Sequence, residues 1–94
     1  MPWHTYILKC SNNTYYVGHT GDLEARIKTH QSGKGSAHTA KHRPVSLVYS
    51  ESFTSKPEAV KREKQIKRWS HDKKAALVND DLIRLMELAK SRNT

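Results

Sequence analysis

Two short runs of β-branched and aromatic residues, HTYILKC (residues 4–10) and TYYVG (residues 14–18), are separated by only three polar residues. This pattern predicts a β-hairpin. If the three residues SNN form the loop, Leu8 lies opposite Tyr16, and Tyr6 shares a face of the hairpin with Tyr16. A two-residue loop would put the two tyrosines on opposite faces, because a slip of one residue inverts a strand.

The segments after the hairpin predict a helix, a loop and a third strand. GDLEARIKTHQSG (residues 21–33) has the pattern of a helix that ends at Gly33. The segment SGKGSAHTAKHRP is rich in Gly, Ser, Lys and His, which is typical of a loop. VSLVYSESF (residues 45–53) alternates apolar and serine positions, which predicts a strand with one apolar face formed by Val45, Leu47, Tyr49 and Phe53.

The second half of the chain predicts helices. SKPE (residues 55–58) has the form of a capping box at the start of a helix that continues through AVKREKQIKRW. SHDKKAALV and DDLIRLMELAK predict one or two more, the last with an apolar stripe of Leu82, Leu85, Met86 and Ala89. The order β-β-α-β-α-α predicts one α+β domain over residues 1–94, a three-stranded antiparallel sheet flanked by helices. Its core spans about residues 3–78, and a C-terminal helix spans about residues 80–90.

Charge and composition narrow the class of protein. Seventeen Lys and Arg residues against nine Asp and Glu give a net charge of +8, which favours a polyanionic partner, most commonly nucleic acid. No apolar run approaches the length of about 18–20 residues needed to cross a bilayer. A single cysteine, Cys10, and no basic-then-apolar pattern at residues 1–10 indicate a reducing, cytoplasmic location.

Two helix positions break the apolar pattern. With Ala59 as the origin, Glu63 lies at about 40°, inside the apolar arc of its helix. A carboxylate there needs a positive or hydrogen-bonding partner, so it is either a structural salt bridge or a metal-binding or catalytic group. His30 faces the sheet in the same way beside Ile27, although a histidine on an apolar face is more often a core residue.

The side chains next to these positions complete a candidate site. Arg26 lies on the flank of the first helix, where pairing with Asp22 is its ordinary alternative. The paired tyrosines of the hairpin have packing as their ordinary alternative. We nevertheless expect two phenols, a guanidinium, an imidazole and a carboxylate to face one sheet–helix cleft.

These residues resemble the motifs of the GIY-YIG nuclease superfamily, and most closely those of its small stand-alone bacterial members. HTY (residues 4–6) occupies the place of the first motif, with His and Thr where the family has Gly and Ile, and YVG (residues 16–18) that of the second. GDLEARIKTH and EAVKREKQIK match the helices in which the family carries its arginine and its glutamate. The resemblance covers about residues 3–78.

The resemblance implies a metal-dependent endonuclease that hydrolyses nucleic-acid phosphodiester bonds, with DNA repair or processing as the expected setting. DNA is favoured over RNA as the substrate, but the sequence does not choose between them. It implies catalytic roles for Tyr6, Tyr16, Arg26 and His30, and it makes Glu63 the ligand of one divalent cation, Mg²⁺ or Mn²⁺. Either Tyr6 or His30 would be the general base. Larger family members carry additional domains that select their substrates, so we expect a protein partner to supply specificity.

Further basic side chains are expected to follow the phosphate backbone. They are Lys34, Lys41, His42, Arg43, Lys61, Lys64, Lys67 and Arg68. Trp3 or Trp69 could stack a base, although packing is the commoner role. The alternative to an enzyme is a nucleic-acid-binding module that does not cut, or cuts only with a partner. A third interpretation, zinc binding through His38 and His42, has no second ligand pair.

Overall fold

The computed structural model describes the backbone of residues 2–92 and the side chains of residues 2–88. The described residues form three strands and five helices, in the order β1 (Trp3–Lys9), β2 (Tyr15–Thr20), α1 (Leu23–Gln31), α2 (Ala37–Lys41), β3 (Ser46–Phe53), α3 (Lys56–Lys67), α4 (His71–Val78) and α5 (Leu82–Arg92). The expected α+β fold, an antiparallel three-stranded sheet flanked by helices, is confirmed.

The sheet has the order β2-β1-β3, with both neighbours antiparallel to β1. The expected hairpin register is confirmed: Leu8 pairs with Tyr16 and Tyr6 pairs with Gly18, so the two tyrosines share a face. The turn closes through a hydrogen bond of 2.9 Å from the Cys10 amide to the Thr14 carbonyl. Within the described part of the chain, β2 pairs with β1 alone, so it forms one edge of the sheet.

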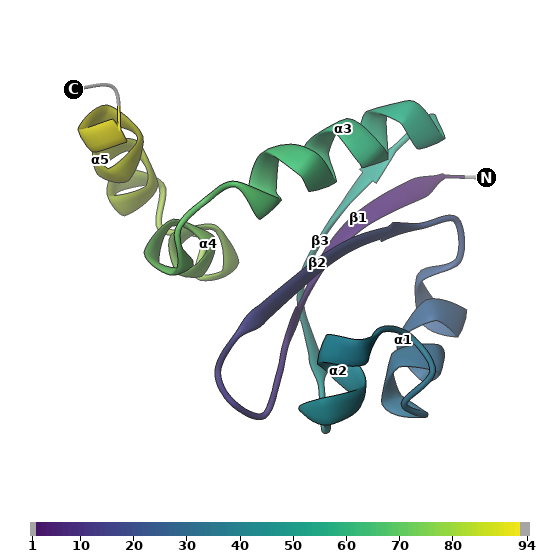
Figure 1. Cartoon of the computed structure of the whole chain (residues 1–94). Helices are drawn as coiled ribbons and strands as arrows, with labels where there is room; N and C mark the ends of the chain where they lie inside the picture. Colours follow the sequence, from purple (N-terminus) through teal and green to yellow (C-terminus); the bar gives the residue numbers. More distant parts are fainter. Residues whose placement is uncertain (1, 93–94) are drawn as a thin grey trace.

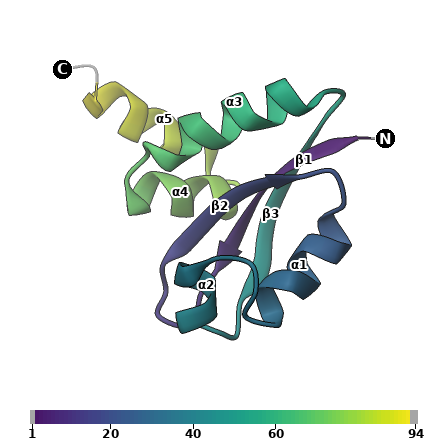
Figure 2. The ribbon, with the colours of Figure 1, turned by 45° about the vertical axis from the view of Figure 1, so that its right-hand side comes forward.

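Helices cover both faces of the sheet (Figures 1 and 2). On one face, Tyr6 and Leu8 of β1 pack with Val45 and with Leu23 and Ile27 of α1. On the other, the core consists of Ile7, Val17, Ile66 and Leu77, which brings α3 and α4 against the sheet. Full burial of an aliphatic side chain contributes about 1.5–3 kcal/mol, so these two clusters fix the helices on their faces.

The third strand departs from the expected alternation. A register shift between Ile7 and Leu8 pairs them with Tyr49 and Leu47, and the extra residue of the bulge is Val48. Val48 and Tyr49 both join the core on the α3 side, whereas Leu47 is exposed. The prediction of one continuous apolar face along this strand is therefore wrong, since a bulge puts two successive residues opposite one.

The segment predicted as a loop contains the short helix α2. Ser36 caps it, because its hydroxyl accepts the backbone N–H of Thr39 at 3.1 Å. The prediction of an unbroken loop is wrong because five helical residues are too few to show a periodic pattern. The first helix ends at Gln31, and Gly33 follows it with a φ of +86°, a conformation that favours glycine.

The capping box before α3 is confirmed. The Ser55 hydroxyl accepts the Glu58 amide, and the Glu58 carboxylate accepts the hydroxyls of Thr54 and Ser55, each at 2.9 Å. These hydrogen bonds lower the pKa of Glu58. In α5, Leu85 packs against the core while Leu82 and Met86 are exposed; the side chain of Ala89 lies outside the described residues.

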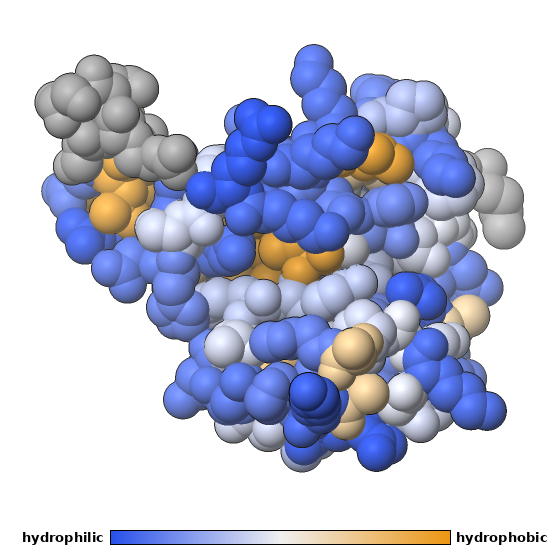
Figure 3. All heavy atoms as spheres, viewed as in Figure 1, coloured by the Kyte–Doolittle hydropathy of each residue, from blue (hydrophilic) through white to orange (hydrophobic). Residues whose placement is uncertain are grey.

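The surface is mainly hydrophilic in the view of Figure 3, with apolar atoms gathered at α5 and beneath α3. Within residues 2–92, no helix combines the length and the apolar character that crossing a membrane requires.

Candidate active site

A buried polar cluster connects β1 with α1. The Tyr6 hydroxyl lies 2.9 Å from His30 Nε2, and Arg26 Nε donates to the same hydroxyl oxygen at 3.4 Å. Arg26 also donates from a terminal nitrogen to the Gly35 carbonyl at 3.4 Å. Tyr6 and His30 have no exposed surface, whereas Arg26 is partly exposed. The guanidinium therefore covers the phenol on its solvent side.

Tyr16 forms the other wall of this cluster. Its ring centroid lies 4.9 Å from that of His30, edge to face, and 6.4 Å from that of Tyr6. Because the hairpin register puts both tyrosines on the α1 face, the two phenols and the imidazole meet above the same part of the sheet. The ring of Tyr16 is partly exposed, so it is accessible where Tyr6 is not.

Two glycines make room for the cluster. A Cβ at Gly18 would lie 2.5 Å from the Tyr6 hydroxyl oxygen, and a Cβ at Gly35 would lie 2.1 Å from His30 Nδ1. Both distances are far below van der Waals contact. The close approach of backbone to the phenol and to the imidazole thus depends on the missing side chains.

Burial and charge set the protonation of the cluster. Burial raises the pKa of the Tyr6 hydroxyl, with Tyr16 and Glu63 adding to the rise, and the hydrogen bond from Arg26 opposes it. Burial lowers the pKa of His30, and the nearby Arg26 charge lowers it further. The phenol and the imidazole are accordingly both neutral at pH 7, beside a charged guanidinium.

Two polar contacts position α3 on the opposite face of the sheet. The Thr5 hydroxyl, buried in β1, donates to the Ala59 carbonyl at 2.8 Å. The Arg62 guanidinium binds the Glu51 carboxylate of β3, with the closest contact at 3.0 Å. Glu51 also accepts the Tyr49 hydroxyl, and burial together with this carboxylate raises the pKa of Tyr49 to about 12.

Glu63 follows these two anchors on α3 and faces the sheet, as its helical position predicts. Its Oε1 lies 2.5 Å from His19 Nδ1, and its Oε2 lies 2.8 Å from Lys67 Nζ. The carboxylate side chain is 12% exposed. Burial opposes its ionisation, but the hydrogen bonds from Lys67 and His19 outweigh burial, and the pKa of Glu63 is lowered.

The expectation that all five side chains face one cleft needs correction. His19 pairs with Thr5 across the hairpin, so it points to the α3 face, away from Tyr6 and Tyr16. Glu63 meets the sheet on this second face. The edge strand β2 separates it from the phenol cluster, and Gly18, which has no side chain, is the residue between His19 and Val17. The two groups lie on either side of one strand edge.

The structural roles considered as alternatives for Arg26 and Glu63 have different outcomes. Among the described residues no ion pair joins Arg26 to Asp22; the Asp22 side chain instead caps α1 by accepting the Ala25 amide at 3.1 Å. The salt-bridge alternative for Glu63 is realised in part, because Lys67 pairs with it. Within residues 2–88 no three His, Cys, Asp or Glu side chains are grouped so as to hold a metal ion.

The predicted basic residues divide into two surfaces. In the segment around α2, Lys34 and Lys41 are exposed, while Arg43 donates to the carbonyls of Gln31 and Ala40. The ring of His42 lies 4.9 Å from that of His38, which bonds Thr14 at 2.8 Å.

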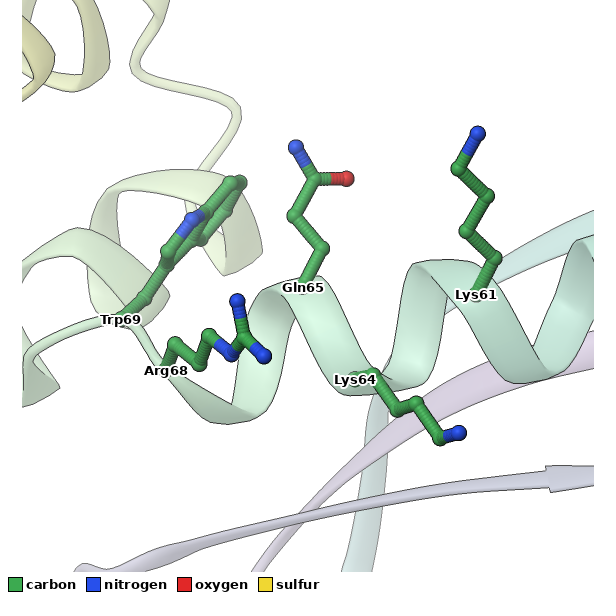
Figure 4. A pocket seen from close by; sticks show the side chains of 5 residues that line it. All are labelled: Lys61, Lys64, Gln65, Arg68 and Trp69. Atoms are coloured by element: carbon green, nitrogen blue, oxygen red, sulfur yellow. The ribbon is translucent and has the colours of Figure 1, made fainter.

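The second surface lies on α3, where an open pocket of about 500 Å³ is lined by Lys61, Lys64, Gln65, Arg68 and Trp69 (Figure 4). We call it the α3 pocket. The cations Arg62 and Lys73 lie 5.2 and 4.4 Å from the Trp69 ring, and Trp69 also packs against the core. Lys67, by contrast, is directed to Glu63.

Sequence reasoning missed two polar residues of the site. His19 directly follows the YVG motif, and strand alternation signals that it faces Glu63 once the faces of the helices are known. Thr39 is fully buried, and its hydroxyl lies 2.9 Å from His30 Nδ1. It lies in the segment predicted as a loop, where no local pattern signals burial.

Comparison with known proteins identifies a common family. A family model described as the GIY-YIG catalytic domain matches residues 2–76. The UPF0213 protein SH2523 of Staphylococcus haemolyticus is 47% identical over 77 residues, covering 82% of this chain and 94% of that protein. A UPF0213 protein of Halobacterium salinarum is 45% identical over 74 residues, covering 79% of this chain and 96% of that protein.

Two solved structures resemble this one. The solution NMR structure of the UPF0213 protein BH0048 from Bacillus halodurans has a TM-score of 0.56 and 41% identity, with 86% of each chain covered. The solution NMR structure of the protein EF2693 from E. faecalis has a TM-score of 0.60 and 30% identity, with 88% of each chain covered. Both support the same arrangement of sheet and helices.

Proposed function

The chain belongs to the GIY-YIG catalytic domain family, and on that premise we propose that it is an endonuclease hydrolysing nucleic-acid phosphodiester bonds with one divalent cation. The observation that carries the proposal is the meeting of Tyr6, His30 and Arg26 beside Gly18, with the Glu63 carboxylate across the same strand edge. We further propose DNA rather than RNA as the substrate, repair or processing as the setting, and a cytoplasmic location.

The scissile phosphate would lie over the edge of β2 at Gly18. At this position no side chain separates the two groups, and among residues 2–92 the strand has no further neighbour in the sheet. Tyr16 and Arg26 present partly exposed atoms on one side of the edge. On the other side His19 is 31% exposed. A phosphodiester can reach all of these groups without entering the core.

Arg26 would bind the phosphate. A guanidinium can donate to two phosphate oxygens at once and stays charged at any working pH. Its contacts to Tyr6 and to the Gly35 carbonyl are both 3.4 Å, the long end of the hydrogen-bond range, so an anion competes with them easily. Movement of Arg26 to the phosphate would also uncover the phenol that it covers.

Tyr6 would then take the proton of the attacking water, and its own proton would pass to His30. The hydroxyl already lies within hydrogen-bond distance of His30 Nε2. The positive charge of Arg26 favours the phenolate through its proximity as well as through the hydrogen bond, so it continues to act when the guanidinium turns to the phosphate. Tyr16, exposed at the mouth of the cluster, would position the water or the phosphate.

Glu63 is the residue that would hold the divalent cation. Mg²⁺ keeps most of its waters and often binds through one or two carboxylates and a substrate phosphate, so a single Glu suits it. One oxygen of Glu63 already faces the ammonium of Lys67, which is 52% exposed and can turn away. When bound, the cation supplies neutralisation of the phosphate charge. His19 would keep the carboxylate turned toward the strand edge.

The remaining basic residues would hold the nucleic acid on either side of the cleavage point. The α3 pocket offers three cationic side chains, Lys61, Lys64 and Arg68, and the segment around α2 offers Lys34 and Lys41. Such contacts add affinity without sequence preference. We therefore propose that a protein partner supplies the choice of target.

Purified protein with Mg²⁺ or Mn²⁺ tests the proposal on single-stranded, double-stranded and branched DNA and on RNA. We expect cleavage that Arg26→Ala and Glu63→Gln both abolish and that Glu24→Gln, an exposed carboxylate on α1, leaves unchanged. Losses of about 100-fold or more are ordinary for groups that stabilise a transition state.

The main alternative is a binding module that does not cut. The complete burial of Tyr6 and the pairing of Glu63 with Lys67 favour it, because both groups must be released before they can react. Nucleic-acid binding that survives both substitutions, with no cleavage of any substrate, would establish the module and reject the enzyme.

A further inference from the structure

The Tyr6–His30 contact is one link of a longer chain of hydrogen bonds. On the other side of the imidazole, His30 Nδ1 lies 2.9 Å from Thr39 Oγ1, and Thr39 Oγ1 lies 2.9 Å from Ser36 Oγ. Tyr6, His30 and Thr39 have no exposed surface. Among the described residues no buried side-chain nitrogen or oxygen lacks a partner. Each hydrogen of this chain must therefore have a definite acceptor.

The direction of the chain follows from its first member. The Tyr6 oxygen accepts the Arg26 Nε–H, and an arginine has no acceptor to offer in return. Within residues 2–88, the remaining hydrogen-bond partner of this hydroxyl is His30 Nε2. The phenol must then donate to Nε2, so Nε2 carries no hydrogen. Burial and Arg26 keep His30 neutral, and its one ring hydrogen is on Nδ1.

The hydrogen bonds at the Thr39 end of this series agree with this direction. His30 Nδ1–H donates to Thr39 Oγ1. The Thr39 hydroxyl can in turn donate a hydrogen bond to the Ser36 carbonyl at 3.3 Å or to Ser36 Oγ. The Ser36 hydroxyl also accepts the Thr39 amide as the cap of α2. Thr39 is thus held by two bonds to Ser36, and its oxygen is directed at the imidazole.

Gly35 lets this segment approach the ring. A Cβ there would lie 2.1 Å from Nδ1 and 2.6 Å from the neighbouring carbons, so only a glycine permits the contact. The backbone at Gly35 therefore packs closely against the Nδ1 side of the His30 ring, whereas the Tyr6 hydroxyl lies on the Nε2 side.

We propose that Thr39, supported by Ser36, is a positioning residue that holds His30 in the Nδ1–H tautomer and leaves Nε2 as the acceptor for the Tyr6 proton. The tautomer assignment is independent of catalysis; the benefit to the reaction depends on the proposed function. In that reaction the Tyr6 O–H bond breaks and an Nε2–H bond forms, giving a phenolate and an imidazolium. In the opposite tautomer Nε2 already carries a hydrogen and cannot accept the proton.

The tautomer can be measured without substrate. We expect long-range ¹H–¹⁵N spectra of histidine-labelled protein near pH 8 to give His30 a protonated Nδ1 and an unprotonated Nε2. The titratable groups around this ring are Tyr6 from β1, Tyr16 from β2 and Arg26 from α1. A protonated Nε2 in the wild type would overturn the proposal.

Variants at Thr39 separate positioning from packing. Thr39→Val keeps the shape and removes the acceptor of Nδ1–H. This cost opposes the preference of the Tyr6 hydroxyl for an unprotonated Nε2, so the His30 ring should move to a mixture of tautomers; Thr39→Ser should restore the wild-type spectrum. Thr29→Val is the matched control, because among the described residues the Thr29 hydroxyl bonds only the Ala25 carbonyl of its own helix, at 3.0 Å. An unchanged tautomer in a folded Thr39→Val protein contradicts the proposal. If that variant does not fold, Thr39→Ala, which also removes the hydroxyl, takes its place, and an unchanged tautomer there contradicts the proposal in the same way.

The activity measurement is a separate arm. We expect Thr39→Val to lower kcat about tenfold or more with KM unchanged, and Thr39→Ser to restore it. Equal losses in kcat for Thr39→Val and Thr29→Val would reject the role in positioning. Wild-type protein that cuts nothing, yet has the Nδ1–H tautomer, would reject the proposed function and leave the assignment of Thr39 standing.

Discussion

Lys67 Nζ lies 2.8 Å from Glu63 Oε2, one turn further along the same helix, and so holds the carboxylate proposed to bind a cation. Lys67 is 52% exposed and Glu63 is 12% exposed, and an exposed pair at this spacing contributes about 0.3–0.5 kcal/mol. The ammonium is therefore a weak competitor for the site, which a hydrated cation can replace.

Lys67→Gln should tighten Mn²⁺ binding about twofold, because it removes the competing charge. Paramagnetic broadening of amide signals near Glu63 during a Mn²⁺ titration measures the affinity without any need for activity. Lys64→Gln, which removes a charge from the α3 pocket, is the matched control and should change the affinity less. Weaker Mn²⁺ binding in the Lys67 variant would mean that this lysine supports the site.

The buried His30 predicts a loss of stability in acid. Its pKa is lowered in the folded protein, whereas in the unfolded chain it is about 6.5. His30 therefore makes its full contribution to the free energy of unfolding above pH 6.5. That contribution is lost as the pH falls towards the folded pKa, because only the unfolded chain then binds the proton.

Urea unfolding between pH 7.5 and pH 5 should show this loss, with a slope of at most about 1.4 kcal/mol per pH unit from one histidine. His30→Gln should flatten the profile over that range. His71→Gln, at an exposed position on α4, is the control and should preserve it. An identical profile for His30→Gln and the wild type would show that the ring is protonated in the folded protein as readily as in the unfolded chain.

Gly18 is predicted to tolerate no side chain. A Cβ there would lie 2.5 Å from the Tyr6 hydroxyl oxygen and 2.7 Å from Tyr6 Cζ, and that ring is fully buried. Gly18→Ala should lower the free energy of unfolding by about 1–3 kcal/mol, as overpacking does. At Gly21 the nearest atom to a Cβ is 3.4 Å away, in Trp3, so Gly21→Ala should cost clearly less. Equal losses for the two alanines in denaturant titrations would contradict this account.

Local patterns were sufficient to predict much of this fold. The hairpin register follows from a three-residue loop and from alternation, both of which are properties of neighbouring residues. The inward position of Glu63 follows from its angle on the helix, and the capping box of α3 from four consecutive residues. In each case the determining interactions lie within a few positions along the chain.

The features that the sequence did not predict correctly depend on contacts between distant segments. The helical angle of Glu63 shows that it faces the sheet. Which of the two faces it meets depends on how β3 leads into α3. The sequence pattern therefore could not predict that the edge strand separates Glu63 from Tyr6. The buried Thr39 depends on a contact with His30 nine residues earlier. The bulge at Val48 likewise depends on pairing with β1.

The α3 pocket predicts a strong salt dependence of nucleic-acid binding. The slope of log affinity against log salt is negative, and each phosphate contact that is lost lowers its magnitude by about 0.7 for a single strand. Replacing Lys61, Lys64 and Arg68 together by Gln should lower the slope by about 2, because all three side chains line one pocket. The corresponding change of Lys34 and Lys41 should lower it by about 1.4, since two exposed lysines are removed.

Fluorescence anisotropy with a labelled single strand over a range of NaCl concentrations measures these slopes, in a Glu63→Gln background that prevents cleavage. The control is a variant that keeps the three charges, Lys61→Arg with Lys64→Arg and Arg68→Lys, and it should retain the wild-type slope. A wild-type slope in the triple Gln variant would mean that nucleic acid does not reach the α3 pocket. The nucleic-acid backbone would then run along the segment around α2 alone, and the Lys34 and Lys41 variant would show the larger loss.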